Sequence, residues 1–336
     1  MRATSRGRLI IVSPAPPGTT LGNSVTADRY ARIFRSLGWR VRILCEYAGE
    51  PADILVGLHA RKSAPSVRAF RARYPTGPII LVLTGTDLYR DIARSRPAQR
   101  ALEVADRLVT LQPDGIGHLP RHLRRKARAI VQSAEPCSPR PAQRRLPFTV
   151  CVLGHLRFEK DPLRAAYAVR DLESLPVRVV HAGKILSPQY ARATRREEQR
   201  NPRYRYVGEL SRARARQVLR HSDLLVQSSR IEGGANTISE AVLCGVPVVA
   251  SRISGNVGML GRTYPGFYDV GDTVGLARLI ERAAASPQFY QKLVTWCARR
   301  KPLMSRSSET AGWRAVLELA APSRVRCAKP HRLAPL

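Results

Sequence analysis

The sequence predicts an α/β protein made of two doubly wound, parallel-sheet domains that face each other across an interdomain cleft. Apolar runs of strand length alternate with helical segments, and the alternation stops and restarts at residues 133–147, which are rich in Pro, Ser, Gln and Arg. At 336 residues the chain is also longer than one average domain. Polar and Gly-rich loops follow several predicted strands, which is where open α/β sheets bind ligands.

These features predict how the chain is divided. Residues 1–146 are expected to form the first domain and residues 147–304 the second. A helix at about 305–320 is expected to pack back on the first domain, and the basic tail at 322–336 is expected to be disordered. In the first domain we expect strands at 8–12, 40–45, 53–58 and 78–83, helices at 25–37 and 64–73, and a helix end with a short strand within 102–111. In the second domain we expect strands at 148–153, 177–182, 204–207, 223–227 and 246–250, a helix that ends at about 172, and helices at 212–221, 271–285 and 288–300. The terminal helix is expected at 309–320.

The composition narrows the class of protein. The formal net charge is +32, and most of the positive charge comes from Arg, because the chain has only seven Lys residues. Such a charge attracts anionic ligands and can bind nucleic acid without specificity. Arg is spread along the chain and aromatic residues make up 6%, so a specific nucleic-acid site is not indicated. The basic stretch at 121–128 fits contact with anionic lipid or a solvated helix face, and the second reading is favoured.

The sequence also predicts a location and whether the protein binds a metal. The apolar run Leu9–Val12 is too short for a signal peptide, and no segment has the length of a membrane-spanning helix. We therefore expect a cytoplasmic protein without stable membrane association. The six Cys residues contain no CxxC pair, so we expect them to be reduced and mainly buried, and we expect no metal site.

The most informative stretch runs from Ser228 to Ala250 and predicts a strand end, a Gly-rich turn, a short helix and a buried strand. Thr237 or Asn236 is expected to cap the helix, and Gly245 is expected to end it. A helix start of this kind binds anions, because its unpaired N–H groups and its dipole point the same way.

Two Gly residues and two carboxylates accompany that helix start. Gly233 and Gly234 have no Cβ, so their amides can point into a site without obstruction. Glu232 and Glu240 lie eight positions apart on either side of the turn. The alternative is an ordinary βαβ turn with packed Gly and solvated Glu. Since free carboxylates repel phosphate, we interpret Glu232 and Glu240 as acceptors of hydrogen bonds from sugar hydroxyls beside a phosphate.

The first domain has three candidate ligand loops. The long Pro- and Gly-rich loop after the first strand contains Gly18, Gly22 and Asn23 and is longer than a usual βα connection. His59, Arg61 and Lys62 follow the third strand and fit either an anion pocket or a solvated loop. Polar residues and Gly also follow the fourth strand, as Thr84-Gly85-Thr86-Asp87.

The second-domain motifs resemble those of the retaining GT-B glycosyltransferases of family 4. Glu232 and Glu240 have the E-x7-E spacing of that family, and Gly154 with Glu159-Lys160 falls where it has its Gly-Arg…Glu-Lys-Gly segment. The resemblance covers about 300 residues. It implies a GT-B fold of two Rossmann-like domains, with an acceptor domain first and a nucleotide-sugar donor domain second.

The resemblance also implies roles for single residues. Glu240 would hold the ribose hydroxyls of a UDP-sugar and Glu232 the hydroxyls of the donor sugar. Lys160 would neutralise the leaving diphosphate, so that no metal or other cofactor is needed. The amides that would bind the diphosphate and sugar belong to Gly233, Gly234, Ala235, Asn236 and Thr237.

The chain departs from the family pattern at two places. His155 stands where the family usually has Arg after the glycine, so Arg157 is expected to take over the phosphate contact. The fourth strand ends in Thr84-Gly85 rather than in a His-Gly pair, which weakens the case for ordinary hydroxyl-acceptor chemistry.

The first domain is similar to a narrower group, the selenosugar synthases of selenoneine biosynthesis. The similar segments are 13–18, 58–63, 83–91 and 154–157. This resemblance implies UDP-N-acetylglucosamine or a relative as donor, selenophosphate as acceptor, a 1-selenosugar as product, and a functional link to an enzyme that produces selenophosphate. His59, Arg61 and Lys62 or the amides of the Gly18–Asn23 loop would complement the acceptor charge. An alcohol acceptor would need a base, and Asp87 could act as one. A transferase to a hydroxyl and a non-catalytic basic binder of nucleic acid or membrane remain the alternatives.

Overall fold

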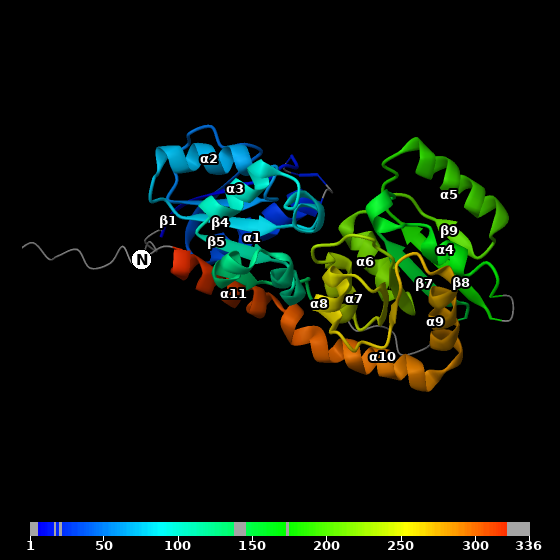
Figure 1. Ribbon diagram of the computed structural model, residues 1–336. Helices are drawn as coiled ribbons and strands as arrows, with labels where there is room; N and C mark the ends of the chain where they lie inside the picture. Colours follow the sequence, from blue (N-terminus) through cyan, green and yellow to red (C-terminus); the bar gives the residue numbers. More distant parts are fainter. Residues whose placement is uncertain (1–5, 17, 20–21, 138–145, 173–174, 321–336) are drawn as a thin grey trace, which may run out of the picture.

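The computed structural model describes residues 6–16, 18–19, 22–137, 146–172 and 175–320, and it contains two parallel sheets in two domains (Figure 1). The predicted α/β class with two doubly wound domains is confirmed. The tail at 322–336 and most of the predicted linker lie outside the described residues.

The first domain is a layered βα structure. Its described strands form one sheet in the order β2-β1-β3-β4-β5-β6, and all neighbours are parallel. Its elements are β1 (Gly7–Val12), α1 (Gly22–Ser36), β2 (Trp39–Leu44), β3 (Ile54–Leu58), α2 (Ala64–Arg73), β4 (Ile79–Leu83), the π-helical turn η1 (Asp87–Asp91), α3 (Arg96–Val104), β5 (Arg107–Thr110), the 3-10 turns η2 (Pro113–His118) and η3 (Arg121–Lys126), and β6 (Ala127–Ala129).

The second domain repeats this design. Its described strands form a parallel sheet in the order β12-β11-β10-β7-β8-β9. Its elements are β7 (Phe148–Leu153), the 3-10 turn η4 (Phe158–Lys160), α4 (Arg164–Ala168), β8 (Val177–Ala182), α5 (Pro188–Arg200), β9 (Tyr204–Tyr206), α6 (Arg212–Arg220), β10 (Leu224–Gln227), α7 (Asn236–Cys244), β11 (Val248–Ser251), α8 (Ser254–Leu260), β12 (Phe267–Tyr268), α9 (Thr273–Ala285) and α10 (Pro287–Arg300).

The strand orders locate the points where ligands bind. In each sheet the chain reverses its direction of progress once, between β1 and β3 in the first domain and between β7 and β10 in the second. Loops at such a switch point diverge to opposite faces and leave a crevice at the carboxyl end of the strands. The loop after β7 contains Gly154 and Lys160, and the loop after β10 contains Glu232, so the predicted donor residues flank the switch point of the second sheet.

The last turn η5 (Lys301–Met304) and helix α11 (Arg306–Ala320) bring the chain back from the second domain to the first (Figure 1). Trp313 of α11 is fully buried, and its ring meets those of Tyr30 and Phe34 of α1 edge-on at 4.6 Å and 4.8 Å. Helix α11 therefore shares one hydrophobic cluster with α1 and the first sheet, while α2 and α3 cover the opposite face.

Some local predictions were wrong. Helix α5 was not predicted, because its sequence is almost wholly polar and only Thr194 and Glu197 are buried. The helix expected to reach residue 172 ends at Ala168.

Among the described residues no helix is long and apolar enough to cross a membrane. The described Cys residues are all free thiols, three of them buried.

Candidate active site

The centre of the candidate site is an ion pair between Lys160 and Glu232. Lys160 ends η4 after β7, and its Nζ contacts Oε2 of Glu232 in the loop after β10. The Ser229 hydroxyl donates a hydrogen bond of 3.3 Å to the same carboxylate oxygen. Both side chains remain partly accessible, with 21% exposed for Lys160 and 15% for Glu232. A ligand can therefore reach both ends of the pair.

A buried polar chain holds Glu232 in place. The Gln227 amide donates to Ser229 Oγ at 2.8 Å, and Thr237 Oγ1 donates to Gln227 Oε1 at 2.8 Å. Ser229 in turn reaches Glu232. Since Gln227 and Ser229 are buried, the carboxylate is oriented from the end of β10 rather than by solvent. Sequence inspection missed both residues, although they directly precede the Gly-rich turn.

The predicted N-cap of α7 is wrong. The N-cap residue is Ala235, which has no side-chain acceptor. Asn236 instead accepts a 2.7 Å hydrogen bond from Arg29 of the first domain, and Thr237 is bonded to Gln227. The first turn of α7 is therefore left without a side-chain cap, as an anion site at a helix start requires. The predicted end is confirmed, because Gly245 has a left-handed conformation at the C-cap.

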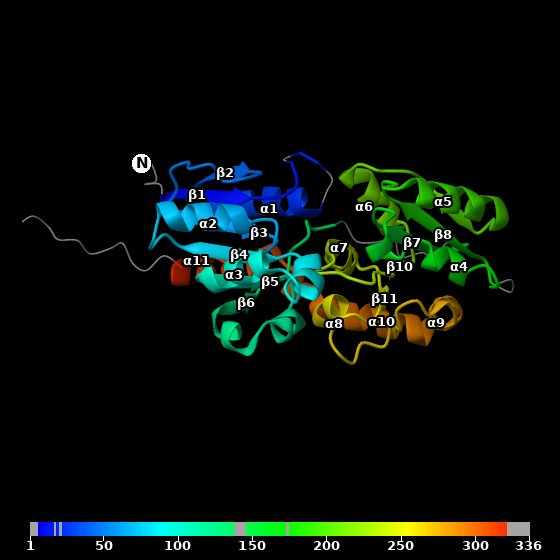
Figure 2. The same ribbon diagram turned by 45° about the horizontal axis from the view of Figure 1, so that its top comes forward.

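The two glycines of the turn, Gly233 and Gly234, allow the two domains to come into close contact. A Cβ at Gly233 would overlap the Thr84 carbonyl and lie 2.8 Å from the Gly85 nitrogen. A Cβ at Gly234 would lie 2.7 Å from the Leu111 side chain. The main chains of the two domains thus touch at the predicted site, and Figure 2 shows α7 and α8 on the side of the second domain that faces the first.

Glu240 lies one turn further along α7 and has an unused carboxylate. Within the described part of the chain it has no hydrogen-bond or ion-pair partner at bonding distance, although Arg29, Arg212 and Arg216 are near. Burial raises the pKa of Glu240, and the nearby guanidinium groups oppose that shift. A largely enclosed carboxylate without a protein partner is suited to ligand hydroxyls.

The loop after β7 supplies the remaining predicted donor residues. His155 Nδ1 accepts a hydrogen bond of 3.1 Å from the Lys184 amide, so its ring joins this loop to the one after β8. Arg157 is exposed at the start of η4. The Gly154 carbonyl accepts a 3.3 Å hydrogen bond from His181 Nε2. His181 is buried and was not predicted as a site residue.

In the first domain, Asp87 organises the predicted acceptor loops. Its carboxylate accepts hydrogen bonds from the amides of Ala60 at 2.9 Å, Gly85 at 2.8 Å and Thr84 at 3.3 Å. The side chain is completely buried. Asp87 therefore joins the ends of β3 and β4, and its oxygens are occupied by main-chain donors rather than free to accept a proton from a substrate.

His59 is held in a similar way. It has a left-handed backbone with φ of 74°, and its Nδ1 accepts a 3.4 Å hydrogen bond from the Lys62 amide. The proton must then be on Nε2, which lies 3.1 Å from the Thr86 hydroxyl. Burial lowers the pKa of His59, so the ring is neutral at pH 7. Both ring nitrogens already have partners.

Arg61 and Lys62 are exposed cations at this edge of the first sheet. Arg61 Nε lies 2.8 Å from the Asp91 carboxylate, while half of its side chain remains accessible. The loop between β1 and α1 also offers open backbone. A Cβ at Gly18 or Gly22 would meet nothing within 4 Å, and Asn23 follows in the first turn of α1.

A second polar cluster joins the domains beside this site, and sequence inspection missed it. Tyr89 and Asp114 of the first domain both contact the Ser254 hydroxyl at the start of α8, at 3.3 Å and 2.7 Å. Gln112 donates to the Tyr89 hydroxyl at 2.7 Å. These residues lie in separate loops, so their spacing in the sequence contains no signal.

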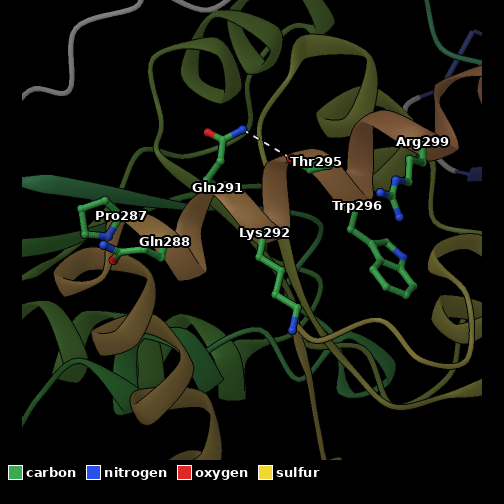
Figure 3. A pocket seen from close by; sticks show the side chains of 7 residues that line it. All are labelled: Pro287, Gln288, Gln291, Lys292, Thr295, Trp296 and Arg299. Atoms are coloured by element: carbon green, nitrogen blue, oxygen red, sulfur yellow. Dashed lines mark hydrogen bonds between the residues drawn. The ribbon is translucent and has the colours of Figure 1, made fainter.

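A hollow of about 730 Å³ lies elsewhere, on the surface of α10 (Figure 3). Its lining residues are Pro287, Gln288, Gln291, Lys292, Thr295, Trp296 and Arg299. All belong to one helix, and none is a predicted site residue. This hollow is a shallow feature of one helix face and not the site described above.

Among the described residues, no cluster of three or more His, Cys, Asp or Glu side chains could hold a metal ion.

Comparison with known proteins identifies the fold. Residues 140–295 match a family model described as glycosyl transferases group 1. Sucrose-phosphate synthase from Thermosynechococcus elongatus is 15% identical over 93% of this chain and 98% of its own, with a TM-score of 0.72. The chain has the GT-B fold.

Other GT-B structures are similar to the same extent. A glycosyltransferase from Rickettsia africae is 14% identical over 94% of this chain and 99% of its own, with a TM-score of 0.71. Anabaena Alr3699/HepE, solved with UDP and glucose, is 15% identical over 93% of this chain and 98% of its own, with a TM-score of 0.68. No curated protein sequence matches significantly. The match to the family model covers most of the second GT-B domain.

We predict that Gly233→Ala keeps the two GT-B domains from closing, because the new methyl group would overlap the Thr84 carbonyl. Small-angle scattering should show a larger radius of gyration than for the unaltered protein. Gly117→Ala is the matched control, since a Cβ there meets nothing within 4 Å. Identical scattering of all three proteins would show that this contact does not limit closure.

We also predict that His181 makes stability depend on pH. Burial lowers the pKa of His181 from 6.5 to about 4, so between these values the unfolded chain binds a proton that the folded protein excludes. The free energy of unfolding should therefore fall by about 3 kcal/mol as the pH drops from 6.5 to 4. Urea unfolding at pH 7 and pH 4 measures this difference in the free energy of unfolding.

His181→Gln should remove that part of the pH dependence. His122→Gln, at a side chain that is 63% exposed, should leave it unchanged. An equal pH dependence in His181→Gln and the unaltered protein would contradict the assignment.

Proposed function

We propose that this protein is a glycosyltransferase that uses a UDP-sugar as donor, with UDP-N-acetylglucosamine as the expected substrate, and selenophosphate as acceptor. One observation carries the donor assignment. Glu240 has an enclosed carboxylate without a partner among the described residues, and it lies eight positions after Glu232, which is paired with Lys160. The fold adds support, because Anabaena Alr3699/HepE was solved with UDP and with UDP-glucose.

The donor would lie across the start of α7. Its ribose hydroxyls would donate to Glu240, and its diphosphate would accept hydrogen bonds from the uncapped amides of the first turn. Lys160 lies within reach of the same place through its pair with Glu232. When the diphosphate binds, the ammonium group exchanges a carboxylate for a phosphate, and Glu232 is released to accept hydrogen bonds from the sugar.

Lys160 would then support the chemical step. The bond between the sugar C1 and the diphosphate oxygen breaks, and negative charge grows on the departing UDP. A fixed ammonium group stabilises that charge without needing to reorganise. Arg157, exposed in the same loop, would add a second cation.

The acceptor loops favour an anion that needs no base. Both oxygens of Asp87 are occupied by amides, and both nitrogens of His59 have partners. Arg61 and Lys62 supply exposed positive charge. Selenophosphate is already ionised and presents a soft nucleophile, so it requires positioning and charge complementarity. A hydroxyl acceptor would have to lose a proton, and neither buried group offers a free site for it.

The proposed reaction has two steps, and in each step one bond forms as another breaks. Selenium attacks C1 as UDP leaves with the electron pair of the broken C1–O bond, which forms a seleno-phosphorylated sugar. Water then cleaves the Se–P bond and gives inorganic phosphate and a 1-selenosugar. An enzyme that makes selenophosphate must supply the acceptor.

We predict that Glu240→Ala weakens UDP binding at least tenfold, because two ribose hydroxyls lose a charged acceptor. Isothermal titration calorimetry with UDP measures the change. Glu281→Ala is the control, since Glu281 is exposed on α9 and far from the predicted site in the sequence. Unchanged affinity in Glu240→Ala would remove the nucleotide assignment.

The acceptor assignment has its own test. Incubation with UDP-N-acetylglucosamine and selenophosphate should give a selenium-containing sugar by mass spectrometry. Arg61→Ala should raise the KM for selenophosphate about tenfold and leave the KM for the donor unchanged, because one charge-assisted contact is lost. Arg68→Ala, at an exposed position of α2, serves as control. Transfer to a hydroxyl acceptor with no selenium in any product would reject selenophosphate.

A further inference from the structure

A chain of hydrogen bonds crosses between the domains at the start of α8, and the chemistry of its members fixes its direction. The Ser254 hydroxyl donates to the Asp114 carboxylate at 2.7 Å. Since an ionised carboxylate only accepts and a hydroxyl has one proton, Ser254 must accept from the Tyr89 hydroxyl at 3.3 Å. The Gln112 amide donates to the same Tyr89 oxygen at 2.7 Å. We refer to Gln112, Tyr89, Ser254 and Asp114 as the interdomain cluster.

Two first-domain members of the interdomain cluster are held by their own domain. Gln112 is completely buried, and its Oε1 accepts a hydrogen bond of 3.1 Å from the Gly115 amide, which fixes the orientation of the side-chain amide. The ring of His118 meets that of Tyr89 edge-on at 4.9 Å. Burial raises the pKa of Tyr89, so the phenol remains a proton donor at neutral pH. Ser254 is the second-domain group that this fixed arrangement meets.

Helix α8 connects Ser254 to the main chain of Glu232. The next residue, Gly255, is buried, and a Cβ there would overlap the carbonyl oxygen of Glu232. Towards the other end of α8, the Met259 sulfur accepts a hydrogen bond of 3.2 Å from the Ala235 amide. The loop between β10 and α7 therefore rests on α8 at two points, so a shift of α8 moves the loop.

The first domain also contacts the far end of α8, but this second contact is weaker. Arg262, just after α8, pairs with the Asp114 carboxylate, and 82% of the Arg262 side chain is exposed. Water and salt screen exposed ion pairs, which therefore contribute little. Asp114 is only 17% exposed, and hydrogen bonds to an ionised carboxylate are among the stronger ones. The contact with Ser254 is therefore the one that can hold α8 in place.

We propose that Ser254 is a positioning residue, through which closure of the domains places Glu232 beside the donor sugar. The hydrogen bond to Asp114 fixes the start of α8, and α8 supports the main chain of Glu232. The chain from Gln227 through Ser229 orients the Glu232 carboxylate from within the second domain, so the two supports act on different parts of the residue. The consequence for catalysis rests on the proposed function, whereas the support of the loop does not depend on a substrate.

Hydrogen exchange of the full-length protein without ligand, followed by mass spectrometry, tests the support itself. Ser254→Ala should speed exchange in the peptide that spans residues 230–236 about tenfold, because α8 loses its contact with the first domain. Asp114→Ala, a change in the first domain, should have the same effect on this second-domain peptide. The double variant should exchange no faster than either single variant, since both changes remove one hydrogen bond.

Matched variants accompany this measurement. Ser254→Thr keeps the hydroxyl and should exchange as slowly as the unaltered protein. Arg262→Gln removes only the exposed ion pair and should change nothing, and Ser308→Ala, at an exposed position of α11, controls for the loss of a serine. Unaltered exchange of residues 230–236 in Asp114→Ala, or a double variant in which the two effects add, would overturn the proposal.

Kinetics test the consequence for the proposed transfer. With UDP-N-acetylglucosamine and selenophosphate, Ser254→Ala should lower kcat about tenfold and leave the Kd for UDP unchanged, because UDP lacks the sugar that Glu232 would contact. Loss of both kcat and UDP affinity would mean that the variant disturbs the whole site, which contradicts a role through Glu232. If the unaltered protein transfers no sugar, the proposed function fails, while the exchange result still decides whether Ser254 supports the loop.

Discussion

The candidate site depends on how closely the main chains of the two domains approach each other. Four glycines of the second domain lie so close to neighbouring atoms at or beside the interface that a Cβ would overlap them. Gly233 and Gly234 meet the first domain at Thr84 and Leu111, Gly258 meets Gln112, and Gly255 packs under the carbonyl of Glu232. The backbone between β10 and α7 is thus pressed between α8 and the first-domain loops. Because packed backbone cannot yield as a side chain can, the position of Glu232 is set by contacts on both sides.

Each domain fixes its loops with buried polar side chains at the carboxyl ends of strands. In the first domain the Asp87 carboxylate gathers amides from the ends of β3 and β4. In the second domain Gln227 and Ser229 carry a hydrogen-bond chain from Thr237 to Glu232. A buried group that lost its partner would cost about 1–3 kcal/mol, so these networks hold the loops in one arrangement. Functional groups placed on such loops need little reorganisation when a ligand binds.

Much of this arrangement could be predicted from the sequence, because the strands of both sheets are continuous apolar runs and the Gly-rich turn precedes a clear helix. Gly245 ends α7 as expected, and β7 and β8 have the predicted bounds. Helix α5 escaped prediction because a solvated helix has no apolar stripe to detect.

The contacts that cross between domains were beyond the reach of sequence patterns. Arg29 and Asn236 are 207 positions apart, and their hydrogen bond replaces a local cap that propensity alone favours. In the same way, the sequence presents Asp87 as a candidate base, while the fold surrounds it with amides. Residue type and spacing predict which side chains can act, but the partner that each side chain meets depends on the tertiary structure.

The two sides of the interface therefore differ in what they can contribute. Among its described residues, the second domain has an accessible ion pair, an uncapped helix start and a carboxylate with no hydrogen-bond or ion-pair partner. Together these fit the neutral hydroxyls and the charged diphosphate of a nucleotide-sugar. The first domain presents exposed cations, while its buried carboxylate and imidazole are engaged in holding loops. This difference supports the proposed anionic acceptor, because exposed cations suit a nucleophile that is already ionised and needs no base from the protein.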